Sequence, residues 1–188
     1  MTPELGHFAL ILAFVVAIAQ GVLPLVGAGT GRFGGQAQWI ALARPAAQTQ
    51  FLLIAFAFGC LAQSFLISDF SVAYVAGHSN TQLPTLYRFS AVWGGHEGSL
   101  LLWVLMLSGW GAAVSIASRQ LPEVMVARVL AVLGLVGIGL LAFILFTSNP
   151  FERLLPAAAE GRDLNPLLQD PGLVFHPPML YMGYVGFS

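Results

Sequence analysis

Residues 129–148, VLAVLGLVGIGLLAFILFTS, decide the fold, because no charged side chain interrupts this apolar run. An α-helix of about 20 apolar residues crosses the hydrocarbon core of a bilayer. Residues 5–26, 46–67 and 98–118 have the same character. The sequence therefore predicts an all-α, polytopic membrane bundle with four spans. A fifth apolar run, residues 179–188, is too short to cross, so we expect a truncated chain that ends inside its fifth helix.

The composition excludes several classes of protein. Hydrophobic residues make up 57% and charged residues 8% of the chain, compared with about 25% charged residues in soluble domains. The chain has no lysine and a net charge of −1, which argues against nucleic-acid binding. A single cysteine, Cys60, excludes an internal disulfide and a thiolate metal cluster. The N-terminus lacks the basic residue of a signal peptide, so we expect the first span to be retained.

Four of the seven arginines, Arg32, Arg44, Arg119 and Arg128, lie on one side of the predicted membrane, in the shorter segments 27–45 and 119–128. The other three, Arg88, Arg153 and Arg162, lie on the opposite side among seven acidic residues. The other side comprises the N-terminus and two long loops, 69–97 and 149–178, and is more acidic. Because arginine-rich loops stay inside, we expect the N-terminus and both loops outside. All four histidines, His7, His78, His96 and His176, fall at or near this outer face.

His176 lies in the stretch GLVFHPPMLYMGY, residues 172–184. Imidazole is a common axial ligand of heme iron. Pro177 favours an extended His176, and Pro178 suits the first position of a helix. This predicts a histidine held at a helix start with little backbone freedom, as a ligand requires. The alternative is an interfacial histidine beside ordinary helix-starting prolines. A second axial ligand must come from a distant part of the chain, because neighbours within one helical turn cannot reach both faces of a porphyrin.

The stretch WGGHEGSLLLW, residues 93–103, is a second candidate. One interpretation is a tryptophan-lined shelf for a flat apolar ligand, with His96 or Glu97 at its polar edge. The alternative is that Glu97 complements a helix dipole and that Trp93 and Trp103 mark the membrane interface.

Two outer segments are predicted to be structural. Residues 69–80, DFSVAYVAGHSN, allow a strand or a short interfacial helix that lies on the surface, with a structural or solvated His78. Residues 148–172 are rich in turn-forming Asn-Pro, Asp-Pro and Pro-Gly pairs. The expected local turn caps there are Asp163, Asn165 and Asp170.

Small and polar residues within the spans indicate helix contacts. Gly134, Gly137 and Gly139 predict close helix packing. Gln20, Gln50 and Gln63 predict interhelical hydrogen bonds. No carboxylate or arginine lies in the middle of a span, which argues against a proton pump or a carrier of charged substrates.

The quoted stretches, together with PELGHFAL, TSNPFERLLP and GRDLNPLLQDPG, resemble the N-terminal part of the CcmF/NrfE family of cytochrome c-type biogenesis proteins. The similarity covers essentially the whole chain. It implies a protein of the bacterial inner membrane that takes heme from the chaperone CcmE. With CcmH, it would help attach that heme to apocytochrome c at the periplasmic face.

The resemblance implies that His176 is one axial ligand of the incoming heme iron, with Trp93, His96, Glu97, Pro177 and Pro178 as supporting residues. It implies no catalytic side chain here, and a role as part of a heme lyase complex that is inactive as this segment alone. The second ligand, a tryptophan-rich motif and a second, membrane-embedded b-type heme are expected outside these residues.

Three alternatives stay open. A transporter of heme or another small molecule would have polar groups across the bilayer and inverted repeats. A structural assembly subunit would have no cofactor. The nitrite-reductase maturation paralogue, NrfE, would differ only in its target cytochrome.

Overall fold

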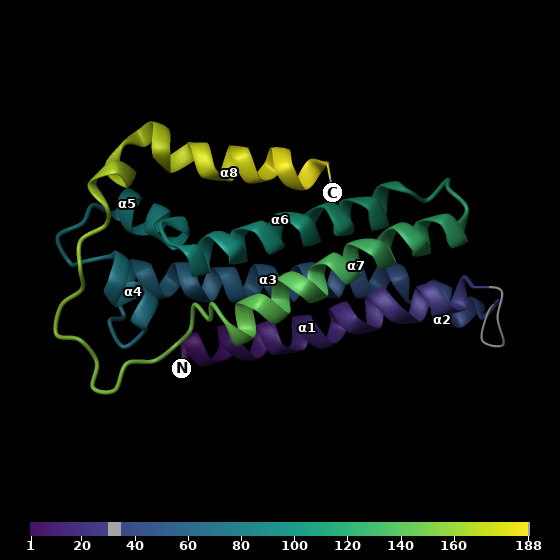
Figure 1. Cartoon of the computed structure of the whole chain (residues 1–188), viewed down its shortest axis with the longest axis horizontal. Coiled ribbons are helices and arrows are strands. Elements are labelled where there is room, and N and C mark those ends of the chain that lie inside the picture. Colours follow the sequence, from purple (N-terminus) through teal and green to yellow (C-terminus); the bar gives the residue numbers. More distant parts are fainter. Residues whose placement is uncertain (30–34, 188) are drawn as a thin grey trace.

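The computed structural model describes residues 1–29 and 35–187 (Figure 1). Arg32, used above to orient the chain, lies outside the described residues. The elements are α1 (Thr2–Gly27), α2 (Ala37–Ala41), α3 (Ala43–Leu66), α4 (Ala73–His78), α5 (Thr85–Ser90), the 3-10 turn η1 (Ala91–Trp93), α6 (His96–Ala117), α7 (Glu123–Phe146), the 3-10 turn η2 (Pro166–Gln169) and α8 (Pro171–Gly186). Within the described ranges there is no β-strand, only one isolated bridge between Val72 and Arg153. The all-α prediction is confirmed.

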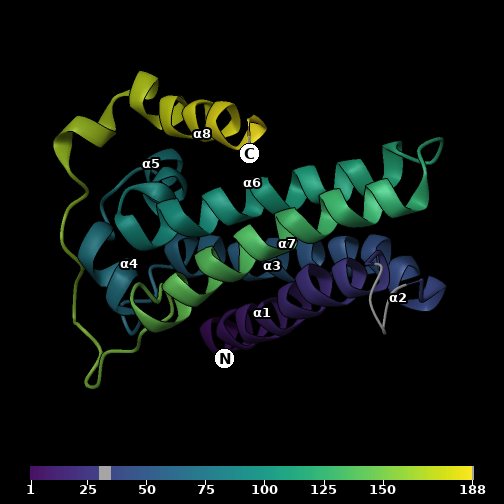
Figure 2. The same cartoon turned by 45° about the vertical axis from the view of Figure 1, so that its right-hand side comes forward.

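Four helices are long and apolar enough to cross a membrane: α1, α3 with α2 before it, α6 and α7. Each predicted apolar run falls in one of these helices, and the runs 46–67, 98–118 and 129–148 extend one or two residues beyond the helix end. α1 packs against α3 and α7, and α6 packs against both α3 and α7, so the four form a bundle (Figures 1 and 2). The short connection between α6 and α7 makes them antiparallel neighbours. The prediction of a membrane bundle with four candidate spans is therefore confirmed.

Small residues let the helices of the bundle approach closely. Ala9, Ala13 and Ala17 follow one face of α1 at helical spacing and are buried. Further along, a Cβ atom on Gly134 of α7 would lie 2.9 Å from the backbone nitrogen of Gly21 in α1. The two helices therefore touch through their backbones, as the sequence predicted for Gly134.

The other predicted contact residues differ in their surroundings. Gln20 donates from Nε2 to the carbonyl of Leu130 in α7 at 2.8 Å, which confirms an interhelical hydrogen bond. A Cβ on Gly137 would lie 2.9 Å from Nε2 of Gln50. No atom of the described residues lies within 4 Å of the Cβ position of Gly139, so the prediction of close packing is wrong there, because this glycine is exposed on the outside of the bundle.

The two long connections fold against each other at one end of the bundle. Backbone hydrogen bonds join Ala73 N–H to Glu152 C=O at 2.8 Å and Arg162 N–H to Ala76 C=O at 2.7 Å. A Cβ on Gly161 would lie 1.9 Å from the carbonyl oxygen of Ser79, so only glycine fits at this crossing. The two predicted loops therefore form one folded layer, which contains α4 and α5 (Figure 1).

Two predictions in this layer are corrected. Residues 69–80 contain a short helix, α4, as one of the two predicted alternatives, but they do not lie on the surface, because Tyr74, Val75 and Ala76 are buried. Asp163 is not a local cap: its Oδ1 accepts from Nδ2 of Asn80, 3.2 Å away on the other segment. In both cases a contact with a distant segment determines the surroundings of the residue, which the local pattern does not specify.

The helix that carries His176 starts earlier than predicted. We expected a start at Pro178, but α8 begins at Pro171, and Oδ1 of Asp170 caps it by accepting from Gly172 N–H at 2.8 Å. An aspartate cap followed by proline strongly favours a helix start, and the helix begins there and not at the Pro177–Pro178 pair. His176 therefore lies in the second turn and not at the helix entrance. α8 runs along α6 on the outside of the bundle (Figure 1).

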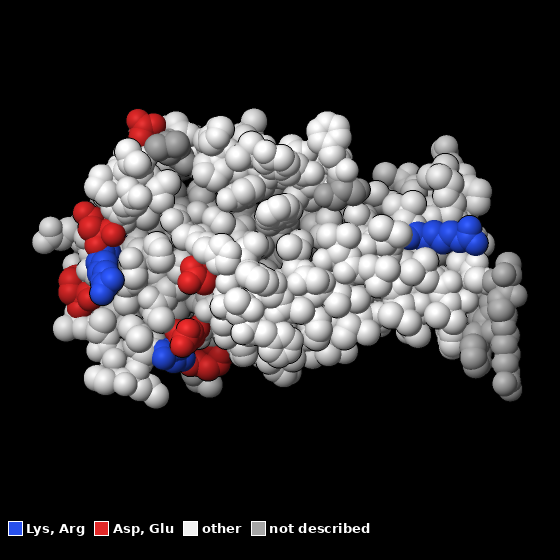
Figure 3. Space-filling view, in the orientation of Figure 1, with Lys and Arg blue, Asp and Glu red and all other residues white. Residues whose placement is uncertain are grey.

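Charged groups gather at the end of the molecule that holds α4 and α5 (Figure 3). At the opposite end, two arginines bind helix termini. Arg44 donates from Nη2 to the carbonyl of Ser118, after α6, at 3.0 Å. Arg128 donates from Nη2 to the carbonyl of Ala28, after α1, at 2.9 Å. These arginines complement the negative ends of two helix dipoles.

Candidate functional site

His176 is exposed on the outward face of α8. The inward face contacts α6: the ring of Tyr181 stacks on Trp103 with a centroid distance of 6.1 Å and an interplanar angle of 6°. Val174 is buried, and a residue two positions later on a helix lies about 200° round the axis. In the described part of the chain, no side chain or backbone group bonds the His176 imidazole, so both ring nitrogens are available.

The neighbours of His176 on this face are apolar. Phe175 is 65% exposed and Met179 is 72% exposed. In the described residues, no group of three or more His, Cys, Asp or Glu side chains could hold a metal ion. The site therefore offers one imidazole between exposed apolar side chains. That donor set fits one axial position of an iron porphyrin, which is flat and apolar, and does not fit a free metal ion.

Trp93 connects the second candidate stretch to α8. Its indole Nε1–H donates to the carbonyl of Val174 at 3.2 Å. In an uninterrupted helix this carbonyl would accept from the N–H of residue 178. Because Pro178 has no N–H, the carbonyl is free for the indole. Pro178 therefore leaves free the acceptor that Trp93 uses, two residues from His176.

Both tryptophans of residues 93–103 contact α8, Trp93 through Val174 and Trp103 through Tyr181. The ring of Trp93 also packs edge-to-face on Phe89, with centroids 5.4 Å apart. The two tryptophans that the sequence suggested as a ligand shelf therefore pack against α8, the helix that carries His176.

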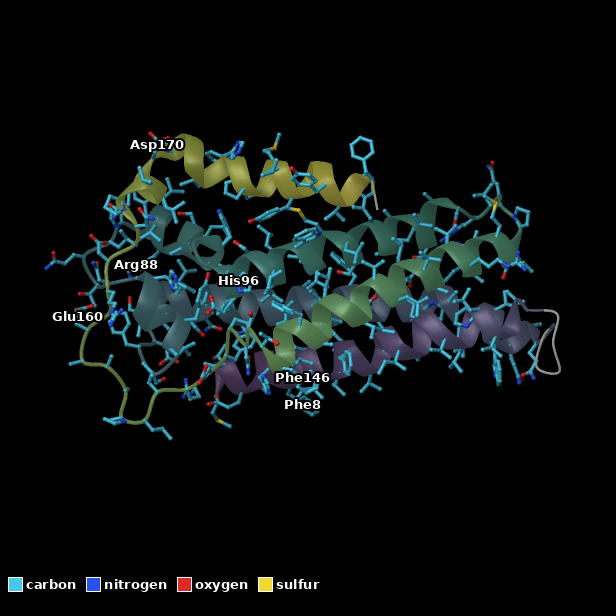
Figure 4. All side chains as sticks on the ribbon, viewed as in Figure 1. Phe8, Arg88, His96, Phe146, Glu160 and Asp170 are labelled. Atoms are coloured by element: carbon cyan, nitrogen blue, oxygen red, sulfur yellow. The ribbon has the colours of Figure 1, made fainter. Side chains whose placement is uncertain are left out.

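His96 and Glu97 have different positions from Trp93. His96 is the first residue of α6, and its Nδ1 lies 3.0 Å from Oγ of Ser148, just after α7. Its ring packs edge-to-face on Phe143 of α7 at a centroid distance of 5.8 Å. Glu97 follows in the first turn of α6, where a carboxylate complements the helix dipole. The structure therefore joins His96, at the start of α6 (Figure 4), to the end of α7. Among the described residues, no contact joins His96 to His176.

Tyr74 is a residue of this region that the sequence reasoning missed. Its hydroxyl accepts from Gly95 N–H at 2.9 Å and donates to the carbonyl of Val92 at 3.0 Å. The Nδ1 of His78 lies 3.0 Å from the Tyr74 carbonyl, and the two rings are 4.6 Å apart. The predicted structural role of His78 agrees with these contacts. The available signal was the glycine pair before His96, which indicates a close backbone approach.

A small ionic group ties the outer layer to the bundle. Arg153 contacts Glu4 of α1, with 3.2 Å between Nε and Oε1, and Asp69, with 3.3 Å between Nη1 and Oδ2. Burial of Asp69 opposes its ionisation, but hydrogen bonds from Ser71 and the charge of Arg153 outweigh burial and lower its pKa. On the surface, the Thr81 hydroxyl donates to Glu160 and lowers the pKa of that carboxyl.

Comparisons with known proteins agree on one family. A family profile described as "Cytochrome C assembly protein" matches residues 93–188. The cytochrome c-type biogenesis protein CcmF of Pseudomonas aeruginosa is 67% identical, over 100% of this chain and 28% of that protein. CcmF of Escherichia coli is 57% identical, over 100% of this chain and 29% of that protein. The chain thus spans less than a third of these relatives.

A solved structure named "Cytochrome c Heme Lyase CcmF" has the same arrangement of helices. The TM-score is 0.81 at 25% sequence identity, over 99% of this chain and 28% of that chain. The fold described above is therefore also found in a named heme lyase.

Proposed function

Because this chain belongs to the cytochrome C assembly protein family, we propose that it forms part of a cytochrome c heme lyase and binds heme iron through His176 during cytochrome c maturation. The observation that carries the proposal is the position of His176. Its imidazole is exposed, has no hydrogen-bond partner among the described residues, and lies on a helix whose opposite face contacts α6.

In this proposal each residue has a limited task. The heme supplies the iron and the vinyl groups that become attached to the thiols of apocytochrome c. His176 provides one axial nitrogen and so fixes the direction from which the iron is held. Phe175 and Met179 flank it with apolar surface. Trp93 holds the first turns of α8 in place, which limits the freedom of the imidazole.

The distribution of charged residues supports one orientation of the protein in the membrane. The end with α4 and α5 carries seven of the eight acidic residues together with Arg88, Arg153 and Arg162, and the opposite end carries Arg44, Arg119 and Arg128 in shorter segments with Glu123 as its acidic residue. By the positive-inside rule, we place the His176 end on the periplasmic side of the bacterial inner membrane. There it would receive heme from the chaperone CcmE and work with CcmH on apocytochrome c. The second axial ligand and a membrane b-type heme would come from other parts of the full-length protein.

The test uses the full-length protein, expressed with the heme-loaded chaperone. We expect His176→Ala to remove the periplasmic heme signal from the absorption spectrum and to abolish covalent cytochrome c, while the membrane heme remains. Tyr184→Ala, at an exposed position two turns further along the same helix and with no task in the proposal, is the control and should retain both. If His176→Ala keeps normal heme content and cytochrome c yield, His176 is not the ligand and the proposal is wrong.

A further inference from the structure

Tyr74 is a buried polar side chain close to the turn that contains Trp93. It is 4% exposed, and its ring packs edge-to-face on Phe65 at a centroid distance of 5.3 Å. Its hydroxyl bonds two backbone groups that flank Trp93, the N–H of Gly95 and the carbonyl of Val92. One side chain of α4 therefore closes the turn that leads into α6.

The turn has no room for a side chain at either of its two glycines, Gly95 and Gly98. A Cβ on Gly95 would lie 2.6 Å from Nε2 of His78 and 2.8 Å from the Tyr74 ring. A Cβ on Gly98 would lie 1.6 Å from the Val92 carbonyl oxygen and 2.7 Å from the Tyr74 hydroxyl. The two glycines thus let α4 and the start of α6 pack in direct contact, with the phenol between them.

The same turn sets the position of Trp93, which lies between the two backbone groups bound by Tyr74. Trp93 in turn donates to Val174, two residues before His176 on α8. The contacts therefore form a continuous path from Tyr74 through Trp93 to the helix that presents the imidazole. Tyr74 itself is buried and does not reach the exposed face, so it acts through others.

We propose that Tyr74 is a positioning residue for the heme ligand: through the Trp93 turn, its hydroxyl fixes α8 and hence the direction of the His176 imidazole. This inference rests on the proposed function of His176. The hydroxyl matters more than the ring, because a phenylalanine would keep the packing and leave two buried backbone groups without partners. Burial raises the pKa of Tyr74, so the phenol keeps its proton and remains a donor.

The experiment compares Tyr74→Phe with Tyr87→Phe in the full-length protein. Tyr87, on α5, is partly buried, and its hydroxyl has no hydrogen-bond partner among the described residues. Tyr87→Phe therefore controls for the loss of a phenol hydroxyl. Hydrogen exchange of the peptide that covers residues 171–186 reports on the docking of α8 without requiring heme. We expect roughly tenfold faster exchange in Tyr74→Phe, which corresponds to about 1.4 kcal/mol, within the range for a lost buried hydrogen bond.

The heme spectrum is the second measurement, because a purely structural role would not change it at equal protein level. We expect Tyr74→Phe to retain heme but to show altered axial ligation and less covalent cytochrome c. Trp93→Phe, which breaks the next contact in the path, should give the same spectral change. If Tyr74→Phe has the exchange rate and spectrum of Tyr87→Phe while His176→Ala still loses heme, the positioning role is refuted and the proposed function stands. If His176→Ala has no effect, both fail.

Discussion

The hydrogen bond between Trp93 and Val174 can be tested by replacing Pro178, whose missing N–H leaves the Val174 carbonyl free for the indole. The indole nitrogen lies 3.2 Å from the carbonyl oxygen, and Val174 is 4% exposed. Trp93→Phe keeps an aromatic ring but removes the donor. It therefore leaves a buried acceptor unsatisfied, which costs about 1–3 kcal/mol. We expect this cost to appear as easier local opening of α8.

The substitution Pro178→Ala should lower the free-energy cost of Trp93→Phe. An alanine at this position supplies a backbone N–H that bonds the Val174 carbonyl within the helix. Trp93→Phe in this background removes a donor that is no longer needed, so its cost should fall to a few tenths of a kcal/mol. The coupling energy of the double-mutant cycle should then be about 1 kcal/mol or more.

Hydrogen exchange of residues 171–186 measures the opening free energy in all four members of the cycle. Pro177→Ala is the matched control, because its new N–H bonds the carbonyl of residue 173, which Trp93 does not use. The effect of Trp93→Phe should be unchanged in that background. Equal costs of Trp93→Phe with Pro178 and with Ala at 178 would refute the reasoning.

Two further predictions concern the bundle and its outer layer. Gly134→Ala should destabilise the protein by about 1–3 kcal/mol, because the new Cβ would meet the backbone of α1. Gly139→Ala, with no described atom within 4 Å of its Cβ, should be neutral or stabilising by up to about 1 kcal/mol. Unfolding experiments in detergent measure both effects. The lowered pKa of Asp69 predicts stability that is present above its unfolded-state pKa of about 4 and lost as the pH falls through its lower folded value. Thermal unfolding between pH 6 and 3 should therefore show a smaller loss of stability in Asp69→Asn than in the native protein, and an identical loss would contradict the ion pair with Arg153.

Hydrophobic length predicted most of the architecture. Four apolar runs of about 20 residues leave few alternatives to membrane-spanning helices, because backbone groups must pair within their own segment in lipid. Residue chemistry also indicated His176, since an imidazole beside two prolines is an unusual group in such a chain. The glycine at 134 and the glutamine at 20 predicted helix contacts that the structure has.

The sequence by itself therefore determined the number of long apolar helices, the class of protein and the candidate ligand, because these depend on composition and on spacing within one segment. Only the tertiary structure decided the contact of Trp93 with α8, the burial of Tyr74 and the pairing of His96 with α7. Each of these depends on a partner far away in the chain: Trp93 for Val174, the α6 turn for Tyr74, and Ser148 for His96. Local patterns do not specify such partners, because a free carbonyl or a buried phenol is stable only once another segment has arrived to bond it.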